Sequence, residues 1–184
     1  MSHIDGTMEY RLKKPVQYSK DGQFVDAEYL EFSEYSGPHR KEYFKLRQFI
    51  TSVVLTVEKA AEGRSKKDVA AEPQKPIADQ TEDEHSVSAD DLATVVGLGF
   101  QMDSSVDTEA FVETFRSMVC NSKKSLCKLD GVTNIRPETW DGMHPDDQFD
   151  AAVKYCCFFG IGLGGISVSG RNTATTRPTQ VKAL

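Results

Sequence analysis

The chain has 184 residues, 39% of them hydrophobic, and a formal net charge of −6. This length suits one domain with a substantial core, or one domain plus flexible parts. No run approaches the roughly 18–20 apolar residues of a membrane span, the first residues lack the basic start and apolar run of a signal peptide, and an acidic chain is a poor general binder of nucleic acid. We therefore expect a cytosolic protein whose partners are neither membranes nor nucleic acids.

Residues 1–8 are predicted to be a flexible leader, and the pattern of a strand begins after them. Polar residues alternate there with apolar ones, which is the period of a strand with one solvated face. The apolar residues are Tyr10, Leu12, Val16 and Tyr18. Pro15 falls on the polar side of the alternation. Because proline cannot donate to a ladder, this should be an edge strand.

A turn and a return strand follow. Asp21-Gly22 is typical of a tight hairpin turn, since both residues tolerate positive φ. The return strand covers residues 24–32, but its apolar residues change face between Tyr29 and Leu30. We interpret this slip as a β-bulge or as the end of the strand. Two strands are marginal in water by themselves, so the hairpin must pack on a helix or pair with another chain.

Residues 38–61 have the pattern of a broad amphipathic helix, and with the hairpin they form the unit of residues 9–61. Apolar residues recur at spacings of three and four. They are Tyr43, Leu46, Ile50, Val53, Val54 and Val57. Ser36-Gly37-Pro38 is a typical helix start and Gly63 a typical stop. Further apolar residues widen the face, so the helix needs cover from at least two directions.

The composition changes at residue 62. Residues 62–88 contain no aromatic residue, and residues 79–91 carry six acids and no Lys or Arg. Such a segment buries too little surface to offset the entropy of ordering it. Residues 62–88 are therefore predicted to be an acidic disordered linker. The alternative is an acidic loop docked on a basic face.

Residues 89–160 are predicted to be the helical part of the same domain. Ser88 can cap a helix whose first turn carries two acids, a second helix covers residues 106–120, and a single turn carries Trp140. The last helix starts at Pro145 and is apolar nearly all round. It should therefore be the most buried helix of this half.

The predicted core joins the long helix to the later ones. Its members are Leu46, Ile50, Val53, Val54, Phe111, Phe115, Phe149, Val153 and Phe159. Residues 129–135 are predicted to form a loop, and residues 161–184, rich in Gly and Thr, a flexible tail. The fold class is therefore α+β: an N-terminal two-stranded antiparallel hairpin packed on a mostly helical domain, with a disordered internal linker and a flexible C-terminal tail.

No constellation typical of catalysis or cofactor binding occurs in the sequence. The glycines of residues 160–165 follow a helix, whereas a dinucleotide fingerprint lies between a strand and a helix. Cys120 and Cys127 are too far apart, and Cys156 and Cys157 too close, for the Cys pairs of structural zinc sites. We interpret all four as reduced, small buried apolar residues. We expect no catalytic, cofactor-binding or metal-binding residues.

The hairpin carries a family resemblance. Three segments make it up: Tyr10-Arg-Leu-Lys-Lys-Pro-Val-Gln-Tyr, the turn Asp21-Gly22, and Val25-Asp-Ala-Glu-Tyr-Leu-Glu-Phe. Over residues 9–35 the chain resembles the start of phage tail assembly chaperones. In that family a short strand with a Leu-x-x-Pro element, a glycine turn and a second strand precede a set of helices.

This resemblance implies a role without catalysis. Members of the family cover apolar stretches of the tape measure protein and help to recruit the tail tube protein during tail morphogenesis. They act in the host cell cytoplasm and are absent from the mature virion. The implied partners are the tape measure protein and the tail tube protein, and a homo-oligomer is left open. Two alternatives stand beside this one: a small cytosolic regulatory or adaptor protein, and a structural virion component such as a head–tail joining protein.

Partner-binding residues are expected where apolar side chains gather near the junction of the hairpin and the long helix. The candidates are Tyr29, Phe32, Tyr43 and Phe44, together with Trp140 in the C-terminal half. They are chosen because aromatic residues dominate binding hot spots. For Trp140, a position in the core is the competing interpretation.

Overall fold

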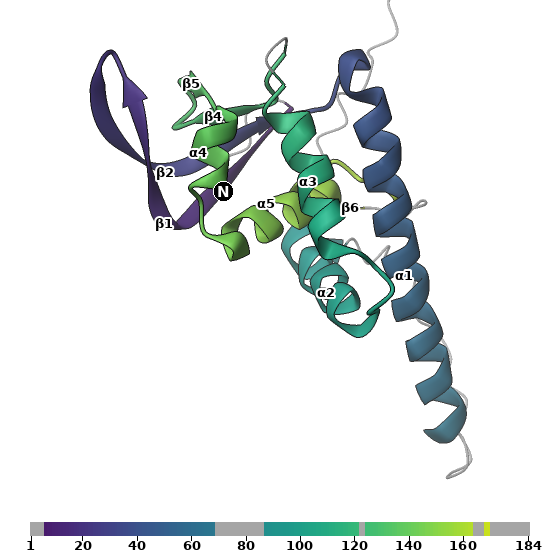
Figure 1. The fold of residues 1–184 in the computed structure, drawn as a ribbon. Coiled ribbons are helices and arrows are strands. Elements are labelled where there is room, and N and C mark those ends of the chain that lie inside the picture. Colours follow the sequence, from purple (N-terminus) through teal and green to yellow (C-terminus); the bar gives the residue numbers. More distant parts are fainter. Residues whose placement is uncertain (1–5, 69–86, 122–123, 164–167, 170–184) are drawn as a thin grey trace, which may run out of the picture.

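The chain folds as a small antiparallel sheet set against a group of helices (Figure 1). The structure, a computed structural model, describes residues 6–68, 87–121, 124–163 and 168–169. The sheet lies at one end of the molecule, and the long helix α1 (Arg40–Asp68) runs past the ends of the other helices (Figure 1). This is the α+β class expected from the sequence. Within the described ranges, no helix is both long and apolar enough to cross a bilayer.

The expected hairpin is present, formed by β1 (Thr7–Lys20) and β2 (Gln23–Ser33). Asp21 and Gly22 connect the strands with φ values of 52° and 81°. A two-residue turn with both φ values positive matches the right-handed twist of the two strands. The turn predicted from Asp-Gly is therefore confirmed.

The strand begins earlier than the sequence indicated. Thr7 and Met8 belong to β1, and Met8 is buried opposite Phe32. The leader predicted for residues 1–8 is therefore wrong at these two positions, because Met8 is part of the core. Residues 1–5 lie outside the described residues.

The predicted irregularity of the hairpin is a bulge on β1. Arg11 pairs with Tyr29 and the next pair is Val16 with Ala27, so residues 12–15 oppose a single residue of β2. The slip seen in the apolar pattern of β2 marks this bulge, although the extra residues belong to the other strand. β1 lies at the edge of the sheet, as its proline required.

Two short strands extend the sheet to the order β1-β2-β4-β5. They are β4 (Cys127–Leu129) and β5 (Thr133–Asn134). The prediction of a loop over residues 129–135 is therefore wrong at 129 and at 133–134, since strands of three and two residues are too short to show a period. β4 pairs with β2 only opposite residues 30–32.

α1 follows the single 3-10 turn η1 (Gly37–His39) and is longer than expected. Residues 62–68, assigned to the linker, continue the helix. A glycine in a helix interior costs only about 1 kcal/mol, so Gly63 does not stop a long packed helix. Residues 69–86 lie outside the described residues. The last two linker residues form β3 (Val87–Ser88), which pairs with β6 (Val168–Ser169).

Four further helices follow: α2 (Ala89–Met102), α3 (Thr108–Val119), α4 (Pro137–Asp141) and α5 (Pro145–Phe158). Ser88 caps α2 as expected, because its Oγ accepts the N–H of Asp91 at 3.1 Å. Asp107 caps α3 in the same way, accepting the N–H of Ala110 at 2.9 Å. These caps satisfy N–H groups that a helix start leaves without partners.

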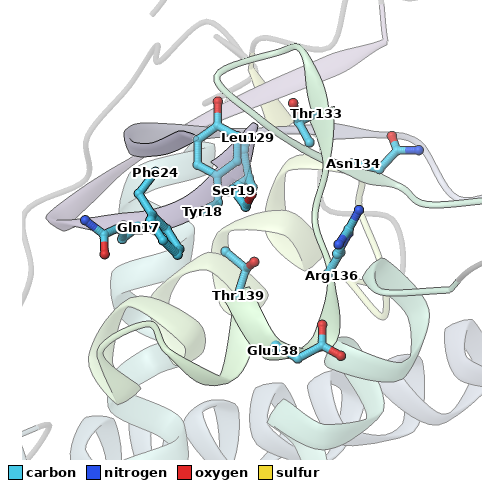
Figure 2. A pocket seen from close by; sticks show the side chains of 10 residues that line it. All are labelled: Gln17, Tyr18, Ser19, Phe24, Leu129, Thr133, Asn134, Arg136, Glu138 and Thr139. Carbon is cyan, nitrogen blue, oxygen red and sulfur yellow. The ribbon is translucent and has the colours of Figure 1, made fainter. Parts of the chain in front are cut away.

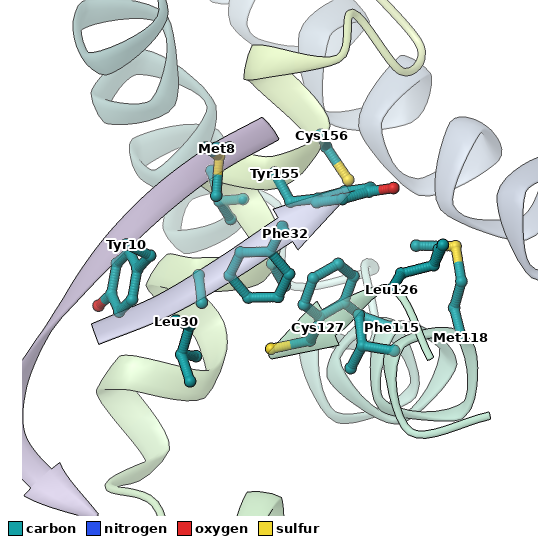
Figure 3. Packing of buried hydrophobic residues seen from close by; sticks show 14 of the residues in the cluster. Met8, Tyr10, Leu30, Phe32, Phe115, Met118, Leu126, Cys127, Tyr155 and Cys156 are labelled. Carbon is teal, nitrogen blue, oxygen red and sulfur yellow. The ribbon is translucent and has the colours of Figure 1, made fainter. Parts of the chain in front are cut away.

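An aromatic cluster joins the sheet to the helices (Figure 3). The ring centroid of Phe32 lies 5.7 Å from those of Phe115 and Tyr155, which are 5.1 Å from each other. Trp140 lies 5.6 Å from Phe115. All four side chains are completely buried. Aromatic pairs at such separations add about 0.5–1.5 kcal/mol each beyond the burial of their area.

The predicted core is confirmed for most of its members. Completely or nearly completely buried are Leu46, Ile50, Val53, Phe111, Phe115, Val153 and Phe159. Val54 and Phe149 are partly buried against this core. The period of three and four in the long helix therefore marked its buried side correctly.

The core also includes the start of the segment predicted to be a tail. Ile161 and Leu163 are buried, and the N–H of Ile161 donates to the carbonyl oxygen of Cys156 at 2.7 Å. Gly162, with φ of 79°, passes α1 so closely that a Cβ there would lie 2.9 Å from the Arg47 carbonyl oxygen. The tail predicted for residues 161–184 is therefore wrong at 161–163, and residues 164–167 and 170–184 lie outside the described residues.

Asp147 connects the bulge of β1 to the first turn of α5. Its Oδ1 accepts the Tyr10 hydroxyl and the Lys13 N–H, both at 3.0 Å, while its Oδ2 is buried without a hydrogen-bond partner. Burial and this carboxylate raise the pKa of Tyr10. The bulge thus directs one backbone N–H of β1 to α5.

Gly99 is predicted to be required where α2 packs on α1. A Cβ at this position would lie 2.5 Å from Cγ1 of Val53 and 2.8 Å from Cγ2 of Val57. Gly99→Ala should lower the free energy of unfolding by about 1–3 kcal/mol, because an extra methyl in a packed interface forces its neighbours to move. Urea denaturation measures this. The control is Gly97→Ala on the same helix, where a Cβ would meet nothing within 4 Å; equal effects of the two substitutions would contradict the close packing.

Asp147→Ala is predicted to destabilise the protein by about 1–3 kcal/mol, because it leaves a buried hydroxyl and a backbone N–H without their acceptor. Asp150→Ala is the matched control on the same helix, since it removes only a partly exposed ion pair with Lys13, which contributes little. Thermal or chemical unfolding of both variants compares them. A loss as large in Asp150→Ala would show that charge, and not the buried hydrogen bonds, holds the bulge.

Candidate functional site

The structure separates the five residues predicted to bind a partner. Phe32 and Trp140 are both 0% exposed, so they belong to the core, and their assignment to an interface is wrong. Phe32 is buried because α3 and α5 cover its face of the sheet, and Trp140 because α4 packs its ring against Phe115. The competing interpretation of Trp140 as a core residue is the correct one.

Tyr43 and Phe44 lie in a small aromatic group at the start of α1. Tyr43 stacks on Tyr35 with ring centroids 4.0 Å apart and meets Phe44 edge-on at 5.7 Å. The guanidinium of Arg40 lies 5.5 Å from the Phe44 ring centroid. Phe44 remains exposed, whereas Tyr35 and Tyr43 are half-buried.

Tyr29 has different surroundings, beside the bulge of the hairpin. It lines a cavity of about 350 Å³ with Glu9, Arg11 and Glu28. Desolvation and the nearby Asp130 carboxylate raise the pKa of its hydroxyl. Tyr29 therefore does not share a surface with the aromatic group at the start of α1.

α2 carries a row of exposed apolar side chains. Val95, Leu98 and Met102 are 45%, 53% and 53% exposed, and their spacing of three and four places them on one side of the helix. The opposite side packs on α1 and α5 through the buried residues Leu92, Ala93, Val96, Gly99 and Phe100. We call Val95, Leu98 and Met102 the α2 stripe.

The α2 stripe borders α1. Gly99, the point of contact with α1, lies within about 100° of each stripe residue around the helix axis, because successive residues are about 100° apart. Val57, which Gly99 meets on α1, is itself only half-buried. Apolar surface therefore continues from α2 onto α1. The apolar residues of α2 cover more of its circumference than α1 and α5 bury, so the pattern alone does not say which of them are covered.

A cavity of about 300 Å³ lies between the tip of the hairpin, the β4–β5 turn and α4 (Figure 2). Tyr18, Phe24 and Leu129 are its apolar lining. Its polar lining includes Thr133, Asn134, Arg136, Glu138 and Thr139. Phe24, at the tip of the hairpin, is 76% exposed.

A larger cavity, about 990 Å³, lies among α3, α4 and α5, and its lining includes several acids. Arg116 donates to both carboxylate oxygens of Asp141 at 2.6 and 2.7 Å and so lowers the pKa of that group. Asp107, Glu109 and Asp146 lie at helix starts, where they complement the helix dipole. These acids thus have a structural role that needs no ligand.

The four cysteines and His39 have structural surroundings. Burial raises the pKa of Cys120 and Cys157 to about 12, and those of Cys127 and Cys156 well above the ordinary value. Such thiols stay protonated at neutral pH and are poor nucleophiles. His39 is buried, with Nε2 2.8 Å from the carbonyl oxygen of Lys124. Among the residues that the structure describes, no three His, Cys, Asp or Glu side chains gather to hold a metal ion.

Comparison of the chain with protein-family models, with curated proteins and with solved structures finds no match. The function has to be inferred from the exposed surfaces described above and from the hairpin.

Trp140, the single tryptophan, is predicted to be shielded from solvent in the native protein. Its fluorescence should be blue-shifted and almost insensitive to acrylamide, because the side chain is fully buried beside Phe115. Unfolding in guanidinium should shift the emission to the red and restore quenching. Efficient quenching in native buffer would place Trp140 back at the surface.

Proposed function

We propose that this protein is a non-catalytic assembly chaperone that binds an apolar helical segment of a longer partner. The observation that carries the proposal is the α2 stripe, a row of exposed aliphatic side chains that continues onto α1. Single exposed apolar residues are ordinary, but a contiguous apolar surface is typical of interaction sites. A partner helix with apolar residues at spacings of three and four can lie along such a surface.

The resemblance of the hairpin to phage tail assembly chaperones supplies the biological setting of the proposal. The partner is then the tape measure protein, whose apolar stretches the chaperone covers while it helps to recruit the tail tube protein. The protein acts in the host cell cytoplasm and leaves before the virion is complete. The resemblance to this family motivates the choice of partner, and the α2 stripe motivates the kind of contact.

The binding residues proposed here differ from those expected from the sequence. The stripe takes the place of Phe32 and Trp140, which the core uses. Phe44 and the half-buried Tyr43 remain a second, smaller apolar surface at the start of α1. Tyr29 is left out, since charged residues surround it.

Leu98→Lys and Met102→Lys are predicted to weaken binding of the partner at least about tenfold each, because a charge replaces an apolar contact worth about 1.4 kcal/mol or more. Co-expression with the largest neighbouring gene product, followed by pull-down and a solubility assay, measures the effect. Leu55→Lys is the matched control. Leu55 is similarly exposed, at 47%, but it lies about 160° around α1 from Val53.

Three outcomes separate the candidate functions. A partner that is soluble only with this protein, and is lost with the stripe variants alone, supports the chaperone. A partner that stays equally soluble without it, with nothing co-purifying, contradicts the chaperone and favours a regulatory or adaptor protein. Mass spectrometry of purified particles tests the head–tail joining alternative, because a chaperone should be missing from them.

A further inference from the structure

Along the outer edge of β2, two halves differ in which residues point their backbone N–H and C=O groups outward. Next to β4, residues with odd numbers point outward: the N–H of Ser33 donates to Leu126 O at 2.8 Å, and Tyr29 O accepts from Asp130 N at 3.1 Å. Next to the turn, Lys20 and Gln23 flank a two-residue loop and form a hydrogen-bonded pair. Since such pairs alternate along an antiparallel ladder, residues 25 and 27 point to β1 and the even-numbered residues point outward.

The side chain of Asp130 marks where the change occurs. The Oδ1 of Asp130 accepts the N–H of Glu28 at 3.0 Å and that of Tyr29 at 3.3 Å. The N–H groups of two successive residues thus point to the same side, opposite the bulge of β1. Asp130 has φ of 48° and turns the chain away from β2 at this point. The pairing of β2 with β4 therefore stops at the Asp130 carboxylate, before β2 itself ends.

Beyond Asp130 the outer edge of β2 meets no further strand of the described part of the chain. Among the described residues, β4 reaches only as far as Leu30, and β2 continues to Gln23. The backbone N–H and C=O groups of Phe24 and Asp26 face outward there. Such unpaired groups are a template for an added strand.

The surroundings of this edge indicate what can bind. The Phe24 side chain, 76% exposed, lines the cavity of about 300 Å³ beside β5 and α4 (Figure 2). The Asp26 carboxylate forms no ion pair within the part of the chain that the structure describes, and its cross-strand neighbour Gln17 is uncharged. Glu28, on the same strand, is paired with Arg11 at 3.9 Å, so Asp26 carries the negative charge that is available on this edge.

We propose that the edge from Phe24 to Asp26 binds an extended, basic segment of a partner protein as an added β-strand. The segment runs antiparallel to β2 and lies beside it from the point near Asp130 at which β4 turns away. Its backbone pairs with Phe24 and Asp26, a Lys or Arg lies opposite Asp26, and an apolar side chain enters the cavity beside Phe24. Backbone pairing provides the contact, and the pocket and the charge provide selectivity.

Charge decides between this partner and a second copy of the chain. Antiparallel pairing of two β2 edges around Asp26 would bring the acids of one copy against those of the other, and like charges facing each other across strands are unfavourable. The outer edge of β1 is a poorer template, because its bulge contains Pro15 and its Lys13 N–H already donates to Asp147. A basic extended segment meets neither obstacle.

A pair of proline variants tests the edge. Asp26→Pro removes an outward N–H of β2 but no hydrogen bond to β1, and proline is tolerated at such positions. Glu9→Pro is the control on β1: Glu9 lies opposite Glu31, whose backbone faces β4, so the Glu9 N–H points to the outer edge of β1. Glu9 does not line the cavity beside Phe24. The probe is a library of acetylated octapeptides built from Val, Phe, Lys and Glu. The tightest binder is then resynthesised with alternate amides N-methylated, which blocks strand pairing without changing the protein.

Binding is followed by heteronuclear NMR and amide hydrogen exchange on the full chain. We expect selection of Lys over Glu, new protection of the Phe24 and Asp26 amides, and at least tenfold weaker binding to Asp26→Pro and of the N-methylated peptide, with binding to Glu9→Pro unchanged. The proposal is wrong if no peptide binds, if protection appears elsewhere, or if the N-methylated peptide binds equally well. A dimer that Asp26→Pro dissociates and Glu9→Pro does not would also overturn it, since the occupant would then be a second copy.

Discussion

Phe32 makes the hairpin and the helices depend on each other. A two-stranded hairpin is marginal in water, and here the inner half of β2 is stabilised by rings from α3 and α5, Phe115 and Tyr155, at 5.7 Å from Phe32. The Tyr155 hydroxyl also donates to the carbonyl oxygen of Ser33 at 3.1 Å, so the same side chain packs on the sheet and holds its backbone. The sheet thus has no separate core. It is stable only where helices from the C-terminal half cover it.

This dependence divides the hairpin into two parts with different roles. The inner half pairs with β4, packs on the aromatic cluster and is tied to α5 through the carboxylate of Asp147. The outer half extends past Asp130, pairs only with β1, and carries the exposed Phe24 at its end. The bulge lies between the two halves and changes which backbone groups point outward. A hairpin built in this way has one end available for a partner without loss of its attachment to the core.

The two surfaces proposed for binding differ in chemistry. The α2 stripe is aliphatic and has the spacing of a helix, so it suits an apolar helical segment. The edge of β2 offers backbone hydrogen bonds and negative charge, so it suits an extended basic segment. They lie on different elements and their occupants differ, so each can be tested without disturbing the other. A protein that holds a long partner during assembly gains from two contacts of this kind, because linked contacts raise the effective concentration of each.

Local patterns in the sequence were enough to determine the hairpin turn, the edge strand, the cap at Ser88 and the buried side of α1. Each depends on neighbouring residues alone: the positive φ of Asp21 and Gly22, the missing N–H of Pro15, the Ser88 oxygen, and a period of three and four. Where an element depends on a distant partner, the sequence was silent or misleading. β4 and β5 are strands only because β2 lies beside them, and Ile161 and Leu163 are buried only because α1 passes close to Gly162.

The binding surfaces could be predicted even less well from the sequence. Phe32 and Trp140 have the aromatic chemistry of interface residues, but the sequence cannot tell whether a ring meets a partner or the helices of its own chain; here their own chain covers both. The apolar residues of α2 spread over a wide arc, and only its contacts with α1 and α5 decide that Val95, Leu98 and Met102 remain exposed. The sequence by itself determined which residues are apolar and with what period. Only the tertiary structure decided which of them stay in contact with water, because burial is a property of what packs against a residue and not of the residue.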